Sequence, residues 1–549
     1  MAQGNFENSI RLLRLILRRE RIISALWIIL LVVYSVALAP SMHDMFPDNA
    51  ARTQVAAVYD NPIMVAMMGP IYGLDNFNAG AMYGGMMLLW YLIAIAVMNI
   101  FYVVRHTRAD EEKGRSEVIR SLPVGRLANL NATMSGAIII NTLLGLGTGL
   151  GLAAIGVEGM DVAGSLLYGA VSGATGLVFA AITALFCQIS SSSGGATGLS
   201  MATLGIAYMI RAAGDMQGND FLSCISPLGL AQRTQVYVAN HWWPVGALLA
   251  IAVLITTVAF KLNSLRDLDQ GFIAARAGRA EGGHLLGSSH GLAVRLLRNS
   301  MLTWVIVMAI FGASYGSVIG DIGTFVGDSP EYLQLIGIPA EVVNAMSDAD
   351  KGKIIVEYFG AFVVTMMTLI SIVPLLNAVL RIRTEEREGR IEHILARPVS
   401  RTTYLAGYVA VAFIVSILIQ FMTAAGLYLV TDAVTDVNPF TFSGLIESFF
   451  SYLPALWVMI GVAVLLVGLL PKATGAIWGF FGFVAFVTFI GGVIDLPDWV
   501  NTLSPMHHIP KMPLEPFMWS PLVALTAIAL MLTVAGFAFY NQRDIVVGD

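Results

Sequence analysis

Long apolar segments recur along the whole chain, and they constrain its fold more than any other feature. A bilayer core about 30 Å thick is crossed by roughly 20 apolar helical residues. We therefore predict an all-α, polytopic membrane protein with twelve spans. In the first half they are Ile22–Ala39, Gly80–Val104, Asn129–Ile155, Gly164–Gln188, Gly195–Ala213 and His241–Phe260. In the second half they are Ser300–Gly320, Glu357–Leu380, Leu405–Val430, Gly444–Leu469, Ala473–Ile494 and Trp519–Tyr540.

The composition favours burial in lipid over a soluble fold. Apolar residues make up 57% of the 549 positions and charged residues only 12%, whereas a soluble domain is about a quarter charged. The two cysteines exclude a disulfide framework. Cys187 and Cys224 also fall on opposite sides of the membrane in the expected topology, so we expect no disulfide between them.

The basic residues predict the orientation, because Lys and Arg are retained on the cytoplasmic side of a membrane. With the N-terminus inside, 25 of the 31 basic residues fall in cytoplasmic segments. Six remain outside: Arg52, Arg211, Arg233, Lys351, Lys353 and Lys511. An even number of spans then places both termini in the cytoplasm.

The segment before the first span is basic and amphipathic. Ala37-Leu-Ala39 resembles a signal-peptide cleavage site, but Arg11-Leu-Leu-Arg14 is echoed in mid-chain by Arg295-Leu-Leu-Arg298. We therefore expect the first span to be retained. Ser9–Arg21 is expected to form an amphipathic helix in the headgroup plane, or else to serve only as topogenic charge.

A charged loop between the second and third spans occurs twice. Residues 108–126 align without gaps on residues 383–401, and nine of the nineteen positions are identical. The identical pairs are Arg108/Arg383, Glu111/Glu386, Gly114/Gly389, Arg115/Arg390, Glu117/Glu392, Ile119/Ile394, Pro123/Pro398, Val124/Val399 and Arg126/Arg401. Internal repeats of this kind indicate a duplicated architecture.

A second match supports the duplication and gives its direction. Ser226-Pro227 and Ser504-Pro505 each precede the sixth span of a half. Because both halves run in the same order from the same side, the repeat is parallel. We predict three parts: residues 1–262 as the first six-helix half with its amphipathic N-terminal helix, 263–294 as a cytoplasmic linker, and 295–549 as the second six-helix half.

The repeated loop is expected to contain a short charged helix. Glu111–Arg115 and Glu386–Arg390 have the spacing of favourable i,i+4 ion pairs. Pro123 and Pro398 are expected to end that helix. Topology alone requires only basic residues, not two glutamates, a glycine and a proline in register. We therefore favour a docking surface for a soluble partner over a merely solvated loop.

At these residues the sequence resembles a known family. The run from Arg105 to Glu117, followed by Pro123-Val-Gly-Arg126, is similar to permease subunits of ABC exporters. Asn61-Pro62 and Gly69-Pro-Ile-Tyr-Gly73 are similar to the bacterial branch named for polyketide-antibiotic (tetronasin-like) export. The resemblance covers essentially the whole chain. It implies a multi-pass protein of the bacterial cell membrane that moves amphiphilic, antibiotic-like compounds out of the cell.

The resemblance also implies a separate motor. In such permeases the loop after the second helix of each half is a coupling helix that docks on an ATPase subunit. That role would fall to Glu111, Gly114, Arg115, Glu117, Pro123, Arg126, Glu386, Gly389, Arg390, Glu392, Pro398 and Arg401. The sequence has no Gly-x-x-x-x-Gly-Lys-Ser/Thr phosphate loop. ATP and Mg²⁺ would therefore bind a partner ATPase, in two copies, and this chain would bind no cofactor.

The resemblance further implies that the second and fifth helices of each half line a substrate path. Methionine and aromatic side chains make adaptable surfaces for amphiphilic molecules, although each could equally serve ordinary helix packing. The candidates are Trp90, Tyr91, Asn99, Met201, Tyr208, Met366, Met367, Asn377 and Trp478. Three ionisable groups near span ends could mark the same path or simply be interfacial: Glu357, Glu447 and Arg211.

Two other functions stay open. A twelve-helix secondary transporter of the facilitator class also has charged loops between its second and third and its eighth and ninth helices, although shorter ones. A membrane scaffold that transports nothing is the other. His507-His508 lacks partners at metal-ligand spacing, so we expect no metal site. We also expect no catalytic constellation and no nucleic-acid partner; lipids are the expected surroundings.

Overall fold

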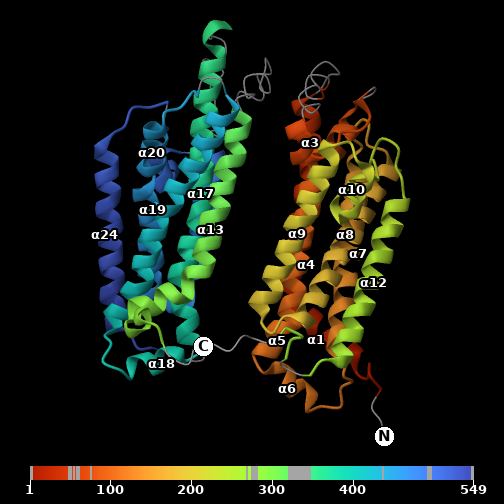
Figure 1. The fold of residues 1–549 in the computed structure, drawn as a ribbon, viewed down its shortest axis with the longest axis horizontal. Coiled ribbons are helices and arrows are strands. Elements are labelled where there is room, and N and C mark those ends of the chain that lie inside the picture. The colour runs from red at the N-terminus through yellow and green to blue at the C-terminus, as the bar shows by residue number, and fades with distance from the viewer. Residues whose placement is uncertain are drawn as a thin grey trace. The chain divides into compact units, whose positions relative to one another are not determined.

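The computed structural model describes residues 4–46, 52, 56, 62–74, 77–267, 270–273, 282–319, 348–435, 438–490, 497–512 and 514–545 of the chain. These residues form helices, with no strand among them, so the predicted all-α fold is confirmed. The chain divides into two compact units, Met1–Gly278 (unit 1) and Arg279–Asp549 (unit 2) (Figure 1). Each unit is described below by itself.

The described part of unit 1 contains six long helices. They are α1 (Ser9–Met45), α4 (Ala79–His106), α7 (Ala128–Ile155), α8 (Val162–Ile189), α9 (Ser193–Met216) and α12 (Trp243–Leu265). Shorter helices connect them: α3 (Pro62–Met68), α5 (Arg108–Glu112), α6 (Arg115–Arg120), α10 (Asp220–Ile225) and α11 (Pro227–Gln232). The start of α1 lies at the same end of unit 1 as α5 and α6 (Figure 1).

Unit 2 repeats this order of elements. Its longer helices are α13 (Ser289–Ile319), α17 (Asp348–Arg387), α19 (Arg401–Val434), α20 (Phe442–Ser451), α21 (Leu453–Leu469), α22 (Ala476–Ile490) and α24 (Trp519–Gln542). Short ones are η2 (His284–Gly287), α18 (Arg390–Leu395), η3 (Pro471–Ala473), α23 (Asp498–Thr502) and η4 (Pro505–His508). Pro454 lies in the first turn of α21, and α20 and α21 together form one candidate membrane span, Phe442–Leu469, which confirms the predicted span Gly444–Leu469.

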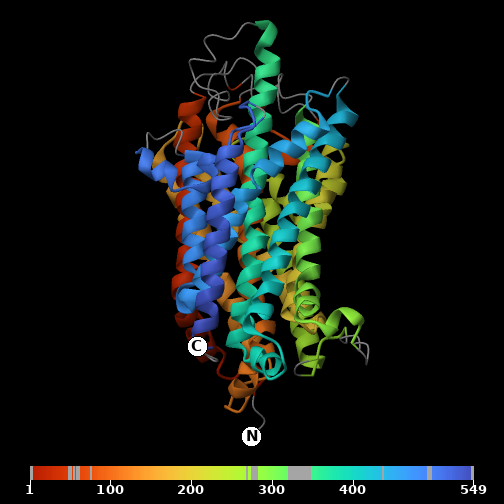
Figure 2. The same ribbon diagram turned by 90° about the vertical axis from the view of Figure 1, so that its left-hand side faces the viewer.

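The two units also repeat the same helix packing. In unit 1, α1 packs on α7, and α8 packs on both α4 and α12. The equivalent pairs in unit 2 are α13 with α19, and α21 with both α17 and α24. Figure 2 shows the long helices of unit 2 side by side, with α18 at the end of the unit where α24 ends. The sequence repeat is therefore a repeat of tertiary structure.

Small residues allow the closest helix crossings. A Cβ atom at Gly312 of α13 would overlap the carbonyl oxygen of Thr423 in α19. One at Gly426 of α19 would overlap the carbonyl oxygen of Ala309. In lipid, where apolar surface gains little from mutual burial, such backbone contact is a main source of helix association.

The predicted count of twelve spans is wrong for the described residues, in which ten helices are long and apolar enough to cross a membrane. The fifth helix of each unit falls short. α9 is long enough, but its glycines and serines together with Arg211 and Asp215 make it too polar. α22 is strongly apolar but has only 15 described residues.

The predicted amphipathic segment Ser9–Arg21 is not a separate helix. It forms the first turns of α1, which runs without interruption from Ser9 to Met45. Leu12, Ile16 and Glu20 of this segment are buried at four-residue spacing, so they lie on one face of the helix. This stripe belongs to the packing of α1 within unit 1, chiefly on α7.

Candidate functional site

The repeated charged loop has the same backbone in both units. In unit 1 it consists of α5 and α6 and the turn before α7; in unit 2 the end of α17, α18 and the turn before α19 are equivalent. Gly114 and Gly389 separate the helices with φ of 66° and 72°. A side chain at Gly114 would meet no atom within 4 Å, so glycine is required there by the left-handed backbone rather than by space.

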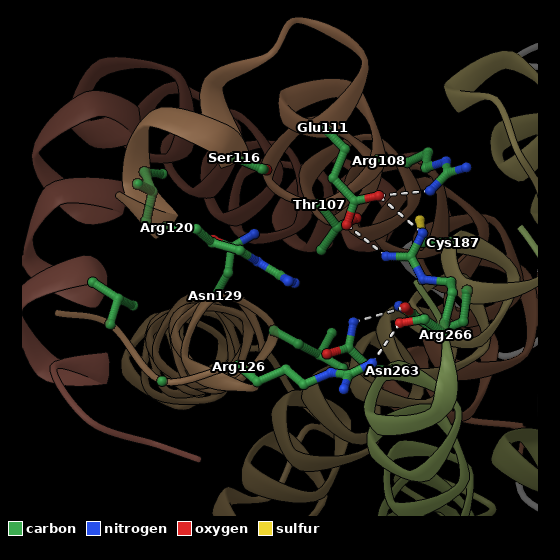
Figure 3. A pocket seen from close by; sticks show the side chains of 15 residues that line it. Thr107, Arg108, Glu111, Ser116, Arg120, Arg126, Asn129, Cys187, Asn263 and Arg266 are labelled. Atoms are coloured by element: carbon green, nitrogen blue, oxygen red, sulfur yellow. Dashed lines mark hydrogen bonds and ion pairs between the residues drawn. The ribbon is translucent and has the colours of Figure 1, made fainter. Parts of the chain in front are cut away.

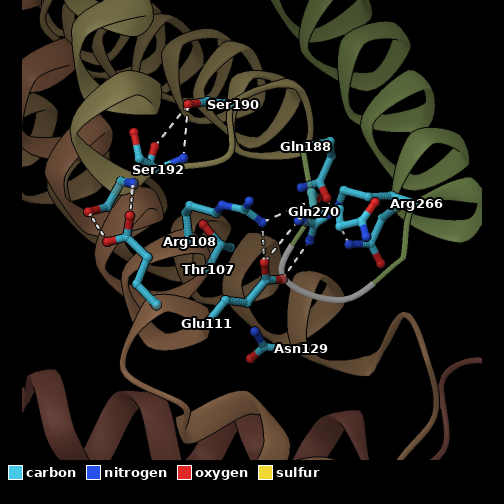
Figure 4. A network of polar contacts seen from close by, with 12 residues as sticks. Thr107, Arg108, Glu111, Asn129, Gln188, Ser190, Ser192, Arg266 and Gln270 are labelled. Carbon is cyan, nitrogen blue, oxygen red and sulfur yellow. Dashed lines mark hydrogen bonds and ion pairs between the residues drawn. The ribbon is translucent and has the colours of Figure 1, made fainter. Parts of the chain in front are cut away.

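A buried carboxylate fastens the loop to the rest of unit 1. Arg108 Nη1 donates to Glu111 Oε2 at 2.6 Å. Arg266, the residue that caps the end of α12, donates from Nη2 to Glu111 Oε1 at 2.5 Å and from Nη1 to Oε2 at 2.9 Å (Figures 3 and 4). All three side chains are buried. Paired charges of this kind avoid the cost of an isolated buried ion.

Unit 2 contains the same buried group of one glutamate bonded by two arginines, which we call the anchor. Glu386 accepts from Arg383 Nη1 at 3.0 Å and from Arg543 Nη2 at 2.5 Å. Arg543 caps the end of α24, as Arg266 caps the end of α12. The backbone carbonyls of the two capping arginines also have equivalent donors. Arg126 Nη2 donates to the carbonyl of Arg266 at 2.7 Å, and Arg401 Nη1 donates to the carbonyl of Arg543 at 2.6 Å.

The predicted i,i+4 ion pairs do not form. Arg115 Nη1 instead donates to Asp110 Oδ1 at 2.9 Å, and Arg390 Nε donates to Glu385 Oε2 at 2.5 Å. The reason is the left-handed glycine between the partners, which redirects the chain so that the i,i+4 geometry of a continuous helix is lost. The hydrogen bond to Glu385 also raises the pKa of Arg390.

The remaining predicted loop residues lie on the surface. The side chains of Glu117, Pro123, Glu392 and Pro398 are all exposed. These residues directly follow the buried glutamate and its arginines in the chain. Each loop therefore has a short exposed segment that is held in place by a buried ion-pair group. The anchoring arginines at positions 266 and 543 were not predicted. Their only sequence signal is a shared Arg-Asp pair after the last span of each half.

Within the described residues, unit 1 has contacts without an equivalent in unit 2, and they tie its loop and the end of α4 to α1 and α9. Arg19 Nη1 lies 2.8 Å from Asp110 Oδ2, and Glu20 Oε1 lies 3.0 Å from Arg105 Nε. The first contact binds α1 to α5 of the loop, and the second binds α1 to the end of α4, just before the loop. Glu112 Oε1 accepts from the backbone N–H of Ser193 at 2.7 Å, at the start of α9. The chain positions that match Arg19 and Glu112 in unit 2 carry Thr303 and Arg387.

The structure separates the candidate substrate-path residues into two groups. Three are buried: Tyr91, whose hydroxyl lies 2.6 Å from Thr148 Oγ1, Asn99, whose Nδ2 donates to Asn141 Oδ1 at 3.0 Å, and Met367. These serve packing within their own unit. Partly or largely exposed are Trp90, Met201, Tyr208, Met366, Asn377 and Trp478. That any of them contacts a substrate stays a prediction.

The three ionisable groups at span ends have ordinary structural partners or solvent. Arg211 is fully buried and donates from Nη2 to the carbonyl of Ala66 at 2.6 Å. Together with Tyr208, whose hydroxyl donates to the carbonyl of Met67 at 3.0 Å, it satisfies the C-terminal carbonyls of α3. Glu447 is exposed, and Glu357 lies 3.9 Å from Lys353. Whether these groups lie at the membrane interface or along a substrate path stays a prediction.

Comparison with known proteins gives one family. The family model described as "Multidrug efflux system permease Rv1217c, C-terminal domain" matches residues 11–262 and again residues 286–541. The chain is also 35% identical, over 549 residues, to the multidrug efflux system permease protein Rv1217c of Mycobacterium tuberculosis, covering 99% of this chain and 96% of that protein. This chain belongs to the multidrug efflux permease family. One model matching both halves of this permease independently supports the internal repeat.

Proposed function

We propose that this permease is the membrane subunit of an ATP-driven ABC exporter that moves amphiphilic, drug-like compounds out of the cell. Its family and its full-length similarity to a protein named as a multidrug efflux permease support export of drugs. The polyketide-antibiotic branch stays a proposal that rests on the sequence resemblance alone. Export would follow alternating access, in which a ligand shifts the equilibrium only by binding the two states unequally.

The duplicated loop is the observation that carries the proposal. Each unit presents an exposed segment, with Glu117 or Glu392, on a buried arginine–glutamate–arginine base. A partner that pushes on this segment would move the ends of the transmembrane helices to which the base is bonded. Because the chain lacks a phosphate loop, we propose that a separate ATPase, in two copies, binds ATP and Mg²⁺ and docks on these two loops.

Charge reversal at the exposed glutamates tests the docking. We expect Glu117→Arg combined with Glu392→Arg to lower the ATPase activity that co-purifies with the tagged full-length permease at least about tenfold. Reversed charges at an interface cost several kcal/mol through repulsion and lost pairing. The matched control is Glu158→Arg, which makes the same charge change at an exposed turn between α7 and α8.

Two outcomes would favour the other functions. If the purified permease alone, in vesicles, accumulates a drug on an ion gradient, then the ATP-driven proposal is wrong and a facilitator is supported. A scaffold is supported by a different combination of results. The ATPase would co-purify with the wild type and be lost from the Glu117→Arg/Glu392→Arg variant, but neither the wild type nor the variant would transport a drug. The proposed orientation, with both termini in the cytoplasm of a bacterial cell, is tested separately below.

A further inference from the structure

The first turns of α1 have an exposed basic face. Arg19 of this segment pairs with Asp110, whereas the other four arginines make no ion pair or hydrogen bond within the part of the chain that the structure describes. At 3.6 residues per turn, these four fall within an arc of about 80°. They form one exposed surface, the basic face of α1, which consists of Arg11, Arg14, Arg18 and Arg21.

The basic face is followed directly by an apolar surface. From Ile22 to Ala39 the helix has no charged residue, and its most exposed side chains there are apolar, with Leu26, Ile29 and Val33 among them. These 18 residues make about 27 Å of helix, which is close to the hydrocarbon thickness of a bilayer, about 30 Å. The boundary between hydrocarbon and headgroups therefore falls at the start of this apolar stretch.

This boundary determines how near each arginine comes to the lipid headgroups. Long side chains of a helix point toward its N-terminus, which here is the direction away from the hydrocarbon. The headgroup layer on each side is about 5–8 Å thick. Along the helix axis, Arg21 lies about 2 Å from Ile22 and Arg18 about 6 Å, whereas Arg14 lies about 12 Å and Arg11 about 17 Å away. Only Arg18 and Arg21 are therefore at the level of the headgroups.

The two residues between Arg18 and Arg21 have contacts inside unit 1. Arg19 pairs with Asp110 of α5. Glu20, which is buried, lies 3.0 Å from Arg105 of α4. One turn of α1 thus holds the neighbouring helices on its inner side and has two arginines without protein partners on its outer side.

We propose that Arg18 and Arg21 bind the headgroup phosphate of an anionic phospholipid, whose acyl chains lie on the apolar surface of α1. Guanidinium groups pair with phosphate through two parallel hydrogen bonds, and anionic lipids attract basic segments at the membrane surface. Unit 2 lacks the pair, because the matching positions after its Arg-Leu-Leu-Arg segment carry Leu302 and Val305. The site belongs to unit 1, and it does not depend on ATP-driven export.

Lipid titration of the full-length permease in detergent tests the site. Dioleoyl phosphatidylglycerol should raise the unfolding midpoint of the wild type saturably and at lower concentration than dioleoyl phosphatidylcholine, because a ligand of the folded state stabilises it. Each arginine at a membrane surface favours an anionic lipid about fivefold. Arg18→Gln/Arg21→Gln should therefore lower the preference for phosphatidylglycerol about 25-fold.

The distance from the boundary gives a graded prediction within the same face. Arg11 lies about one screening length, 8–10 Å at physiological salt, beyond the headgroup layer. We therefore expect Arg11→Gln to change the preference less than about twofold, although it removes the same charge from the same helix as Arg21→Gln. The two single variants distinguish a site at headgroup level from a general effect of basic charge.

Matched variants separate a lost site from lost charge and from lost folding. Lys113→Gln/Arg397→Gln removes two positive charges from exposed positions of the charged loops and should leave the preference within about twofold of the wild type. Arg18→Lys/Arg21→Lys keeps the charge and should retain part of the preference, because an ammonium group lacks the two-pronged geometry. Each variant must first elute as a single species and unfold cooperatively in phosphatidylcholine.

Three results would overturn the proposal. In the first, Arg18→Gln/Arg21→Gln keeps the wild-type preference, which would mean that these arginines serve only membrane topology. In the second, this variant and Lys113→Gln/Arg397→Gln lose the preference equally, so that net charge alone decides. In the third, inorganic phosphate without lipid gives the same stabilisation at equal ionic strength, and the Arg18→Gln/Arg21→Gln variant loses it, so that the ligand is a free anion.

Discussion

At the scale of single residues, the most informative group is the buried carboxylate held by two arginines in each unit. Glu111 and Arg108 are close in sequence, and their identity in both halves was visible from the repeat. Arg266 lies 155 positions from Glu111, so no local pattern could connect them. The i,i+4 pairing was a wrong prediction for a related reason. It assumed a continuous helix, whereas the left-handed Gly114 ends one.

Removing one arginine of this group should destabilise the fold. In Arg266→Met, Glu111 keeps only Arg108, and a buried charge left partly uncompensated costs about 3–5 kcal/mol. The loss should appear in denaturant unfolding of the detergent-solubilised permease. Arg295→Met, which removes an exposed arginine, is the control and should change the unfolding free energy little. If the two substitutions lowered the unfolding free energy equally, the anchor would contribute no more to stability than an exposed arginine.

At the scale of elements, the apolar runs predicted where helices lie better than how far they extend. Ten of the predicted spans correspond to helices that can cross a membrane. Most of these helices begin before or end after the apolar run, because polar residues at their ends are held by neighbouring elements. Arg19 and Glu20 in α1 are an example, since their ion pairs to Asp110 of α5 and Arg105 of α4 allow the helix to continue beyond the apolar segment.

Two glycines should respond oppositely to the same substitution. Gly426→Ala places a Cβ against the carbonyl oxygen of Ala309 at the crossing of α13 and α19, and overpacking costs typically about 1–3 kcal/mol. Gly246→Ala in α12 meets no atom within 4 Å and should be neutral or stabilising by up to about 1 kcal/mol from helix propensity. Unfolding midpoints of the two variants check this. A midpoint for Gly426→Ala equal to or above that of the wild type would contradict the close crossing.

At the scale of the whole molecule, duplication is what the sequence revealed most completely. Nineteen aligned loop residues and the Ser-Pro pair before each sixth span were enough to predict two parallel halves, and both halves match the same family model. The differences between the halves were harder to predict from the sequence. They depend on which side chains meet in space, such as Tyr540 near the loop of unit 2, and these contacts join residues more than a hundred positions apart.

The proposed orientation can be measured with single cysteines. In a Cys187→Ala/Cys224→Ala background, Glu158→Cys should react with a membrane-impermeant maleimide in intact cells. Val118→Cys, which is exposed in α6, should react only after permeabilisation. The charge distribution requires this order, because it places the residue 118 loop on the side that retains basic residues. Labelling in the reverse order would show that both termini face outward.

In unit 1, hydrogen bonds hold α9 at both of its ends, and they connect the charged loop to α3. Glu112 holds the first residue of this helix, and Arg211 and Tyr208 hold it to α3 near its other end. At 1.5 Å per residue, its 24 residues make a strut of about 36 Å. A rigid helix that is held at both ends can transmit a displacement along its axis. We therefore expect a displacement of the α5–α6 loop to be passed through α9 to α3.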